Sequence, residues 1–389
     1  MQRNLDADDI MQTNAFIDLI LVRKALTGQD LELGCASLSS WGISTQQDSL
    51  LAGSSVITRW LDWTLYDALV DNPLLIVHHP SESDEQPWLS LAVPGWLGVL
   101  SGLNENASWA SLNMGNDHPM LNAEGLDPVC QDIRRGLERL DYNADGASNA
   151  LDVYTALNEG NHLHGTIIHI ISENDGQTIT AAVETNNSGT AIRYYDQNGN
   201  LPGNHLAATN HFRVLTYPTC CDRYANITDS LTTNHHMTAK RQWQVLSGAA
   251  GQQNNLSAIQ YTPSTGALLW SGATTSLPAY QAPALSLNAQ TLFSYNVANP
   301  QETLTPALPD LRCHPNPLSA SEILKVSSSE PFQNLSLYNL RGQQLFTSAS
   351  SQPARQLEIE LPPLPAGVYL LRATHPQGRQ SVRKILLWH

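Results

Sequence analysis

Residues 33–42 read Leu33-Gly34-Cys35-Ala36-Ser37-Leu38-Ser39-Ser40-Trp41-Gly42, with a cysteine placed after a glycine and before small and hydroxylated residues. A deprotonated thiol is a strong nucleophile, and a nearby base or amine can remove its proton. A lone cysteine is also often a small buried apolar residue. Upstream, one helix face is predicted from the spacing of Ile17, Ile20, Leu21 and Ala25. Other parts of the sequence are needed to distinguish a catalytic from a structural role for the Cys35 thiol.

The composition is typical of an exported protein with a sizeable core. The chain has 389 residues, which favours two domains, and 41% of them are hydrophobic. The formal net charge of −15 argues against a nucleic-acid partner, because such a partner requires a basic face. Asn, Gln, Ser and Thr are abundant, whereas Lys is scarce. No apolar run reaches the roughly 18 residues of a transmembrane segment, so none is predicted.

The N-terminal region is acidic and lacks a continuous apolar core. It carries Asp6, Asp8, Asp9 and Asp18, so we expect no signal peptide in this sequence.

The cysteines and histidines do not form a recognisable metal motif. The chain has five cysteines, an odd number, so at least one thiol stays unpaired, and no C-x-x-C spacing is present. His162-x-His164 and His235-His236 lack a carboxylate or a third histidine at a metal-ligand spacing. We interpret these histidines as hydrogen-bonded or exposed side chains.

Short strands separated by Gly and Asn turns predict an antiparallel meander. Residues 165–171 and 177–184 flank an Asn-Asp-Gly turn and predict a hairpin. Residues 55–64 roughly alternate polar and apolar positions, as in a half-buried strand. Arg59 and Asp62 lie three apart in this strand, and by pattern alone a solvated surface ion pair is the simpler interpretation.

Residues 128–159 predict two helices joined by a calcium-binding loop. Helical spacing is seen at Val129, Ile133, Leu137 and Leu140. The loop places oxygen-bearing side chains at positions one, three, five, nine and twelve, with glycine at six: Asp141, Asn143, Asp145, Asn149 and Asp152. Aspartate at position twelve resembles a dockerin-type loop rather than an EF-hand. The alternative is an Asn- and Asp-rich turn without a metal.

The order of several fragments resembles the N-terminal-nucleophile (Ntn) amide hydrolases. The fragments are Gly34-Cys35-Ala36-Ser37, Thr58-Arg59-Trp60-Leu61-Asp62-Trp63, Gly98-Val99-Leu100-Ser101-Gly102-Leu103-Asn104-Glu105, Ser111-Leu112-Asn113, Ala208-Thr209-Asn210-His211 and Asp222-Arg223-Tyr224. They are most similar to the penicillin acyltransferase-like branch, related to choloylglycine hydrolases and acid ceramidase. The resemblance implies an α+β fold over residues 1–302, a four-layer αββα sandwich, with residues 128–159 as an insert.

The resemblance also implies how the cysteine becomes active. Cys35 would be the nucleophile and would cut its own chain at Gly34-Cys35. The new α-amine, with a reference pKa near 8, could then act as the base for the thiol. Asp62 would hold this amine, and Arg59 would sit beside the thiolate and lower its pKa.

Three further residues match the family pattern. Asn113 matches an asparagine that follows the Gly-x-Asn-Glu segment, and Arg223 matches an arginine before an aromatic residue. Asn210 matches an asparagine of the oxyanion hole, where a neutral donor stabilises a tetrahedral oxyanion. A Cys35–His211 dyad is the alternative mechanism.

The sequence departs from the pattern in two places, which concern the substrate more than the nucleophile. Asn104-Glu105-Asn106-Ala107 stands where Asn-Glu-Lys-Gly is usual, and Trp60 stands where Asn is commoner. The implied reaction is hydrolysis or transfer of an acyl group at a linear amide through a thioester on Cys35. The substrate would be a small acylated amide, and catalysis would need no cofactor. A catalytically inactive surface binding protein on the same fold and a calcium-dependent adhesion protein stay open as alternatives.

The C-terminal part differs in pattern from the rest. Residues 303–317 are proline-rich and predict a linker, and residues 318–389 alternate like a small all-β sandwich. Four segments resemble the type IX secretion sorting domain of Bacteroidetes-like bacteria: His314-Pro315-Asn316-Pro317, Leu337-Tyr338-Asn339-Leu340-Arg341-Gly342, Leu364-Pro365-Ala366-Gly367-Val368-Tyr369 and Arg383-Lys384-Ile385-Leu386-Leu387. The resemblance implies the type IX secretion machinery as a partner. It places the protein outside the cell or on the outer-membrane surface of a Gram-negative bacterium. The alternative is a carbohydrate-binding sandwich.

Overall fold

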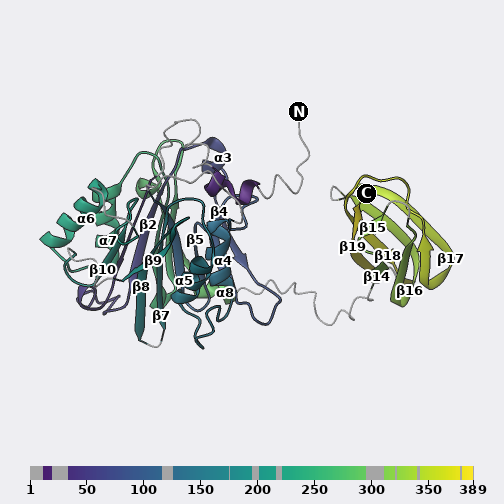
Figure 1. Ribbon diagram of the computed structural model, residues 1–389, viewed down its shortest axis with the longest axis horizontal. Coiled ribbons are helices and arrows are strands. Elements are labelled where there is room, and N and C mark those ends of the chain that lie inside the picture. Colours follow the sequence, from purple (N-terminus) through teal and green to yellow (C-terminus); the bar gives the residue numbers. More distant parts are fainter. Residues whose placement is uncertain are drawn as a thin grey trace. The chain divides into compact units, whose positions relative to one another are not determined.

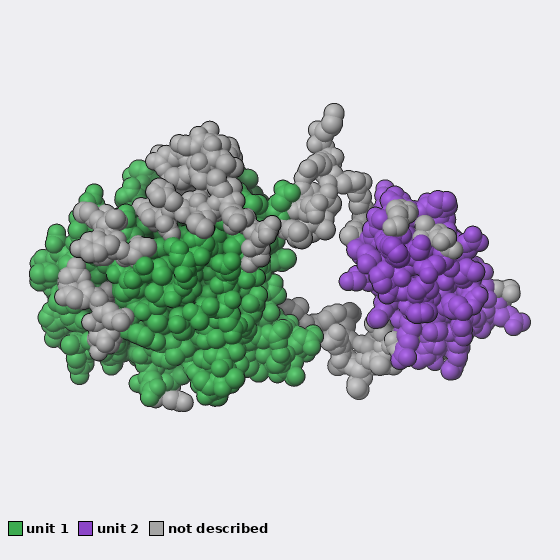
Figure 2. Space-filling model, viewed as in Figure 1, with its two compact units in different colours: residues 1–296 green, residues 297–389 purple. Residues whose placement is uncertain are grey.

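The computed structural model divides the chain into two compact units, residues 1–296 and 297–389 (Figure 2). The residues that it describes are 12–19, 34–115, 126–174, 176–194, 201–215, 221–294, 311–319, 322–339, 342–376 and 379–388. Ile20, Leu21 and Ala25 of the helix predicted before Cys35 lie outside this set, as does Cys220. Each unit is described by itself.

Two antiparallel sheets form the centre of the first unit (Figure 1). The first sheet has the order β10-β1-β2-β11-β12-β13, and the second has the order β3-β4-β5-β6-β7-β8-β9. The strands of the first sheet are β1 (Gly34–Ser40), β2 (Val56–Asp62), β10 (His205–Ala208), β11 (Asn255–Thr262), β12 (Ala267–Gly272) and β13 (Leu285–Asn288). Those of the second are β3 (Leu74–His78), β4 (Trp88–Ala92), β5 (Ser101–Asn104), β6 (Trp109–Met114), β7 (Thr166–Asn174), β8 (Gln177–Asn186) and β9 (Gly189–Tyr194). Ile57 and Tyr261 of the first sheet share a buried cluster with Leu89 and Trp109 of the second, so apolar side chains join the two sheets.

Helices cover the outer faces of both sheets. The helices of this unit are α3 (Asp67–Val70), α4 (Val129–Glu138), α5 (Ala150–Glu159), α6 (Asp222–Thr233), α7 (Ala239–Ala250) and α8 (Ala289–Ser294). Leu38 of the first sheet packs in one cluster with Leu246 of α7, and Ile168 of the second packs with Ile133 of α4. Figure 1 shows α6 and α7 on one side of the sheets and α4 and α5 on the other. The predicted αββα four-layer fold is confirmed.

Local capping explains where two of these helices begin. The Asn149 side chain accepts a hydrogen bond from the Leu151 amide, and Asp152 reaches back to the Asn149 amide, which forms a capping box for α5. The Thr238 side chain accepts from the Arg241 amide at the start of α7. The helix predicted to include Leu140 is shorter, because α4 ends at Glu138 and Leu140 is exposed.

The strand expected to be half-buried is buried at every position of β2. The helix layer covers one face of the first sheet and the second sheet covers the other, so neither face of a central strand meets water. Arg59 and Asp62 are 0% and 1% exposed. The interpretation of these two residues as a solvated surface pair is therefore wrong.

The second unit is entirely β in the residues that the structure describes. Its strands are β14 (Leu311–His314), β15 (Leu318–Ser319), β16 (Leu324–Asn339), β17 (Gln344–Ile359), β18 (Gly367–Thr374) and β19 (Gln380–Trp388). They form one hydrogen-bonded sheet around a core that includes Leu335, Leu371 and Ile385. Strand β14 lies within the segment predicted as linker, yet it pairs with β16, so this unit contains residues before 318. None of the described helices of the chain is long and apolar enough to cross a membrane.

Candidate active site

Cys35 lies near the start of β1, a central strand of the first sheet. Gly34 pairs with Asp62 across the β1–β2 ladder, and Ser37 pairs with Arg59. Strand β10 lies on the other side of β1 and leads to Asn210. The Cys35 side chain is completely buried. The Gly34–Cys35 bond thus lies where two strands and a following loop meet.

Arg59 contacts the thiol directly. Its Nη2 atom lies 3.7 Å from Cys35 Sγ and donates a hydrogen bond to the Leu112 carbonyl oxygen at 2.6 Å. Burial lowers the pKa of the guanidinium, while the Cys35 and Asp62 groups raise it. The carbonyl fixes the direction of this donor, so a thiolate on Cys35 would meet a positioned positive charge. Arg59 thus lies beside the Cys35 thiol, and its effect on the pKa of that thiol in the active enzyme stays a prediction.

Asp62 faces Arg223 and a residue that sequence reasoning missed. Arg223 Nη1 lies 2.9 Å from Asp62 Oδ2, and Asn255 Nδ2 donates to Asp62 Oδ1 at 2.9 Å. Burial raises the pKa of the Asp62 carboxyl, and Arg223, the Asn255 hydrogen bond and Arg59 oppose that effect. Asn255 is 193 residues from Asp62 in the chain, and no local motif marks it. Its amide and Arg223 together hold the carboxylate at the end of β2.

Asn210 holds the backbone nitrogen of Cys35 in the uncut chain. Its Oδ1 accepts from the Cys35 amide at 3.1 Å and from Arg223 Nη1 at 3.3 Å. Its Nδ2 donates to the Met114 carbonyl oxygen at 2.7 Å. Asn210, expected to serve the oxyanion hole, therefore bonds to backbone groups here, and its oxygen accepts from the nitrogen that would become the α-amine. Asp62, expected to hold that amine, instead lies opposite Gly34.

Asn113 belongs to a buried polar network between the two sheets. Its Nδ2 donates to Ser37 Oγ at 2.9 Å. The His169 ring bonds to Ser37 Oγ through Nδ1 at 2.8 Å and to Ser39 Oγ through Nε2 at 2.9 Å. Burial lowers the pKa of His169 to about 3, so the ring is neutral. The sequence signal for this network is the alternation of Ser37 and Ser39 with apolar residues, which sequence reasoning did not use.

The thiol is held in its neutral form in the uncut chain. Burial raises the pKa of Cys35, which Arg59 and Arg223 lower and Asp62 raises again. Because burial has the largest effect, the positive charges offset it only in part. The thiol therefore needs a base before it can attack, and cleavage at Gly34–Cys35 would create an amine on the same residue.

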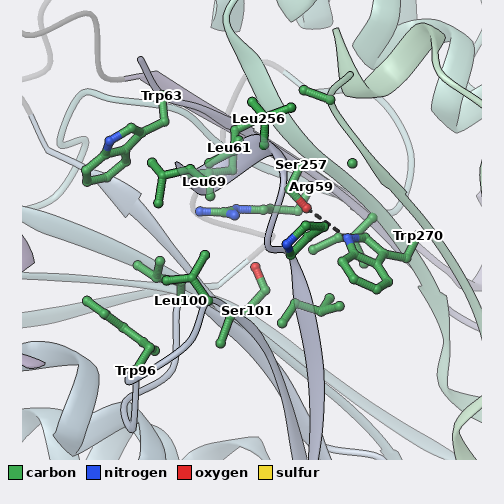
Figure 3. Close-up of a pocket in the computed structure, with 18 of the residues that line it drawn as sticks. Arg59, Leu61, Trp63, Leu69, Trp96, Leu100, Ser101, Leu256, Ser257 and Trp270 are labelled. Atoms are coloured by element: carbon green, nitrogen blue, oxygen red, sulfur yellow. Dashed lines mark hydrogen bonds between the residues drawn. The ribbon is translucent and has the colours of Figure 1, made fainter. Parts of the chain in front are cut away.

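A mostly apolar cavity of about 250 Å³ lies beside Arg59 (Figure 3). Its wall includes aromatic and aliphatic side chains from both sheets and their loops, among them Trp63, Leu69, Trp96, Leu100 and Trp270. Arg59 lines this cavity and also contacts the thiol. One side chain thus connects the cavity to the nucleophile.

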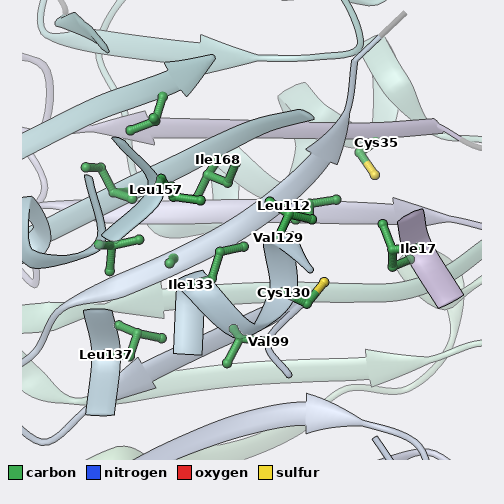
Figure 4. Close-up of a cluster of buried hydrophobic side chains, with 14 of the residues drawn as sticks. Ile17, Cys35, Val99, Leu112, Val129, Cys130, Ile133, Leu137, Leu157 and Ile168 are labelled. Carbon is green, nitrogen blue, oxygen red and sulfur yellow. The ribbon is translucent and has the colours of Figure 1, made fainter. Parts of the chain in front are cut away.

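The segment before the predicted cleavage site contributes to the same cavity. Residues 12–14 and 16–19 are helical, and Phe16 and Ile17 line the cavity. Ile17 and Cys35 belong to one buried cluster (Figure 4). Asn14 donates to the Gly95 carbonyl and accepts from the Leu97 amide at 2.6 Å, which ties the segment to the loop that carries Trp96.

The predicted calcium loop connects α4 to α5. Gly146 at position six has a φ of +90°, a conformation that favours glycine. The Asp141 and Asp145 carboxylates accept hydrogen bonds from loop amides, and both Asp152 oxygens accept from the Asn143 and Asn149 amides. Asn143 and Asn149 also point amide nitrogens to Asp145. Among the described residues, no group of three or more His, Cys, Asp and Glu side chains is arranged to hold a metal ion. Calcium binding stays a prediction.

Two of the histidines that sequence analysis considered have partners inside the protein. His162 Nε2 lies 3.0 Å from Asp132 Oδ2, and its Nδ1 bonds to Thr185 Oγ1. His164 Nε2 lies 3.7 Å from Asp18 Oδ1, on the segment before the predicted cleavage site. His162 and His164 therefore anchor neighbouring elements. The four described cysteines, Cys35, Cys130, Cys221 and Cys313, are free thiols.

Solved structures similar to this chain include two kinds of amide hydrolase. One is the Caenorhabditis elegans ortholog of N-acylethanolamine-hydrolyzing acid amidase, with a TM-score of 0.44 and 15% identity, covering 65% of this chain and all of that one. The others are two mutant forms of the conjugated bile acid hydrolase of Clostridium perfringens, both 10% identical, with TM-scores of 0.39 and 0.38. These two cover 65% and 66% of this chain and 93% of their own.

Two sequence comparisons cover smaller parts of the chain. Residues 312–387 match the family model described as a secretion system C-terminal sorting domain, which confirms the prediction for this region. The protein dcd1B of Dictyostelium discoideum is 30% identical over 98 residues, 24% of this chain. That match spans about a fifth (19%) of the length of the relative.

Proposed function

We propose that the chain is an exported cysteine Ntn hydrolase that cuts itself at Gly34–Cys35 and then hydrolyses or transfers an acyl group at a linear amide. One observation carries the proposal. A buried thiol at the start of a central strand has Arg59 at 3.7 Å from its sulfur and Asn210 at 3.1 Å from its backbone nitrogen. These two contacts suit a nucleophile whose own α-amine acts as its base after cleavage.

Self-cleavage would proceed within this arrangement. Cys35 Sγ adds to the Gly34 carbonyl carbon, the bond to the Cys35 nitrogen breaks, and the thiol proton passes to that nitrogen. Water then hydrolyses the thioester, which leaves a Gly34 carboxylate and the free thiol. Arg223, whose Nη1 donates to the Cys35 carbonyl oxygen at 3.3 Å, would hold the strand during the exchange.

The mature enzyme would repeat this chemistry on a substrate. The α-amine of Cys35 takes the thiol proton, and the thiolate attacks the amide carbonyl carbon beside Arg59. The C–N bond breaks, the amine leaves with that proton, and water or an acceptor releases the acyl group from the thioester. The apolar cavity beside Arg59 supports an apolar acyl group as the part that binds.

The C-terminal unit would direct export. Its match to a secretion sorting domain supports the type IX machinery as a partner and a location outside the cell or on the outer-membrane surface.

The intact mass of purified protein tests the mechanism first. We expect the wild type to contain a chain that begins at Cys35, and Cys35→Ala to stay uncut and inactive towards acyl anilides. Cys35→Ser is the matched control, since a hydroxyl can still attack, and it should cut more slowly. Hydrolysis that survives in Cys35→Ala would contradict the mechanism. An uncut wild-type chain without activity would favour the binding protein on the same fold.

A further inference from the structure

Polar groups interrupt the apolar wall of the cavity, among them Arg59, Ser101 and Ser257. Arg59 is completely buried, and its Nε and Nη1 atoms have no hydrogen-bond partner. Ser101 is 1% exposed, and its hydroxyl has no partner either. Ser257 Oγ accepts from Trp270 Nε1 at 3.2 Å. All three residues line the cavity.

The two unsatisfied groups line the same cavity. In Figure 3 the Ser101 hydroxyl points towards the Arg59 side chain, across the space between Leu69 and Leu100. Ser101 opens β5 in the second sheet, whereas Arg59 lies on β2 of the first, so the pair spans the two walls. This pair is also near the nucleophile, because Arg59 Nη2 lies 3.7 Å from Cys35 Sγ.

A plain alkyl chain does not suit this wall. A buried donor left without a partner is energetically unfavourable. An acyl chain of methylene groups would cover Arg59 and Ser101 without satisfying either. A guanidinium only donates, and a serine hydroxyl donates and accepts. The complement to this pair is an oxygen atom that accepts hydrogen bonds.

We propose that the preferred acyl group carries a hydroxyl or keto oxygen within the first few carbons of the scissile carbonyl, and that Ser101 selects it together with Arg59. This inference rests on the proposed function, since it names the substrate class of the same site. The position of the oxygen follows from the chain path. The acyl carbon binds to Cys35 Sγ, which Arg59 Nη2 contacts. The unpartnered Nε and Nη1 atoms belong to the same guanidinium, so an oxygen that bonds to them lies within the first few carbons of the acyl carbon.

Substrate pairs test the preference. Octanoyl p-nitroanilide is compared with its 2-, 3- and 4-hydroxy and 3-oxo forms, using kcat/KM of the self-cleaved enzyme. We expect one oxygenated form to exceed the plain substrate by about 10-fold or more. Ser101→Ala should lower the ratio of kcat/KM for that oxygenated form to kcat/KM for the plain octanoyl anilide by about 10-fold. Equal rates for all forms, or an equal loss for all in Ser101→Ala, would overturn the inference.

Ser90→Ala is the matched control. Ser90 is also a 1% exposed serine with an unpartnered hydroxyl in the second sheet, but it does not line the cavity. It should keep the wild-type preference. If Ser90→Ala changed the preference as Ser101→Ala does, selection by Ser101 would be wrong.

A binding measurement separates this inference from the proposed function. Calorimetry with the uncut Cys35→Ala chain compares octanoic acid with its hydroxy and oxo forms. Tighter binding of one oxygenated acid by about 10-fold supports the inference even without hydrolysis. Equal affinities overturn it. Absence of self-cleavage and of all anilide hydrolysis in the wild type would instead contradict the proposed function alone.

Discussion

The Cys35 site and the 141–152 loop are built in opposite ways. The loop is one continuous segment, and its side chains bond mainly to backbone amides a few residues away. The Cys35 site takes Arg59 from β2, Asn210 from the segment after β10 and Arg223 from α6. Its contacts join residues up to 193 positions apart. Asp141 and residues 144–147 of the loop are exposed, whereas the Cys35 side chain is buried.

This difference determines how far a substitution should act. In the loop, backbone amides fix each carboxylate, so the loss of one affects its own turn. In the site, Arg223 bonds to Asp62, Asn210 and Cys35 at once, so moving one group changes the others.

Asp62→Asn should have the largest effect. It keeps the shape of the side chain but removes the charge that faces Arg223 Nη1 at 2.9 Å. We expect self-cleavage and hydrolysis to fall about 100-fold or more, because a partly buried guanidinium loses its partner. Time courses by mass spectrometry measure cleavage. Asp229→Asn, at an exposed position of α6, should behave as the wild type; a similar loss there would remove the contrast.

Retention of the segment before Cys35 should depend on pH. Burial raises the pKa of Asp18 from 3.8 to about 6, and the charges that face it are His162, His164 and Asp132. Between about pH 4 and pH 6 the Asp18 carboxyl is therefore protonated in the bound segment and ionised in the released segment. Binding is strongest below about pH 4 and weakens, by about 100-fold, as pH rises to about 6.

Gel filtration of the cleaved enzyme at pH 4.5 and pH 7.5 measures this retention. Asp18→Asn should abolish the difference between the two pH values, because the amide does not titrate. Stronger retention at the higher pH would contradict the assigned direction.

Gly34→Ala should slow self-cleavage by about 10-fold. A Cβ atom at this position would lie 2.5 Å from Arg223 Nη1, so the guanidinium would have to move away from Asp62. The rate of appearance of the chain that begins at Cys35 measures the effect. Gly248→Ala in α7 is the control, since a Cβ there meets nothing within 4 Å. Equal cleavage rates for both variants would show that Arg223 does not need its present position.

Asp145→Ala should have the smallest effect, and only if the loop binds calcium as the sequence predicts. We expect calcium to raise the melting temperature of the wild type by about 2–4 °C and to leave the variant unchanged. Self-cleavage should be the same in both. An identical melting temperature of the wild type with calcium and with a chelator would count against calcium binding. Slower self-cleavage in Asp145→Ala would show that the loop contributes to the Cys35 site.

The sequence by itself determined the features that depend on neighbouring residues. The nucleophile candidate follows from Gly34-Cys35, the loop turn follows from Gly146, and the sorting domain follows from a series of short segments. The four-layer fold came from the resemblance, which the order of strands and helices supports. Spacing along a chain suffices for these because the interacting groups are close in sequence.

Only the tertiary structure decided the environment of the thiol. The alternation in β2 predicted half-burial, whereas packing on both faces buries Arg59 and Asp62 and makes their charges act on Cys35. Asn255, far along the chain, completes the shell of Asp62. The unpartnered hydroxyl of Ser101 can bind a ligand only because Ser101 lines a cavity. Burial and partner choice result from long-range packing, which no local spacing encodes.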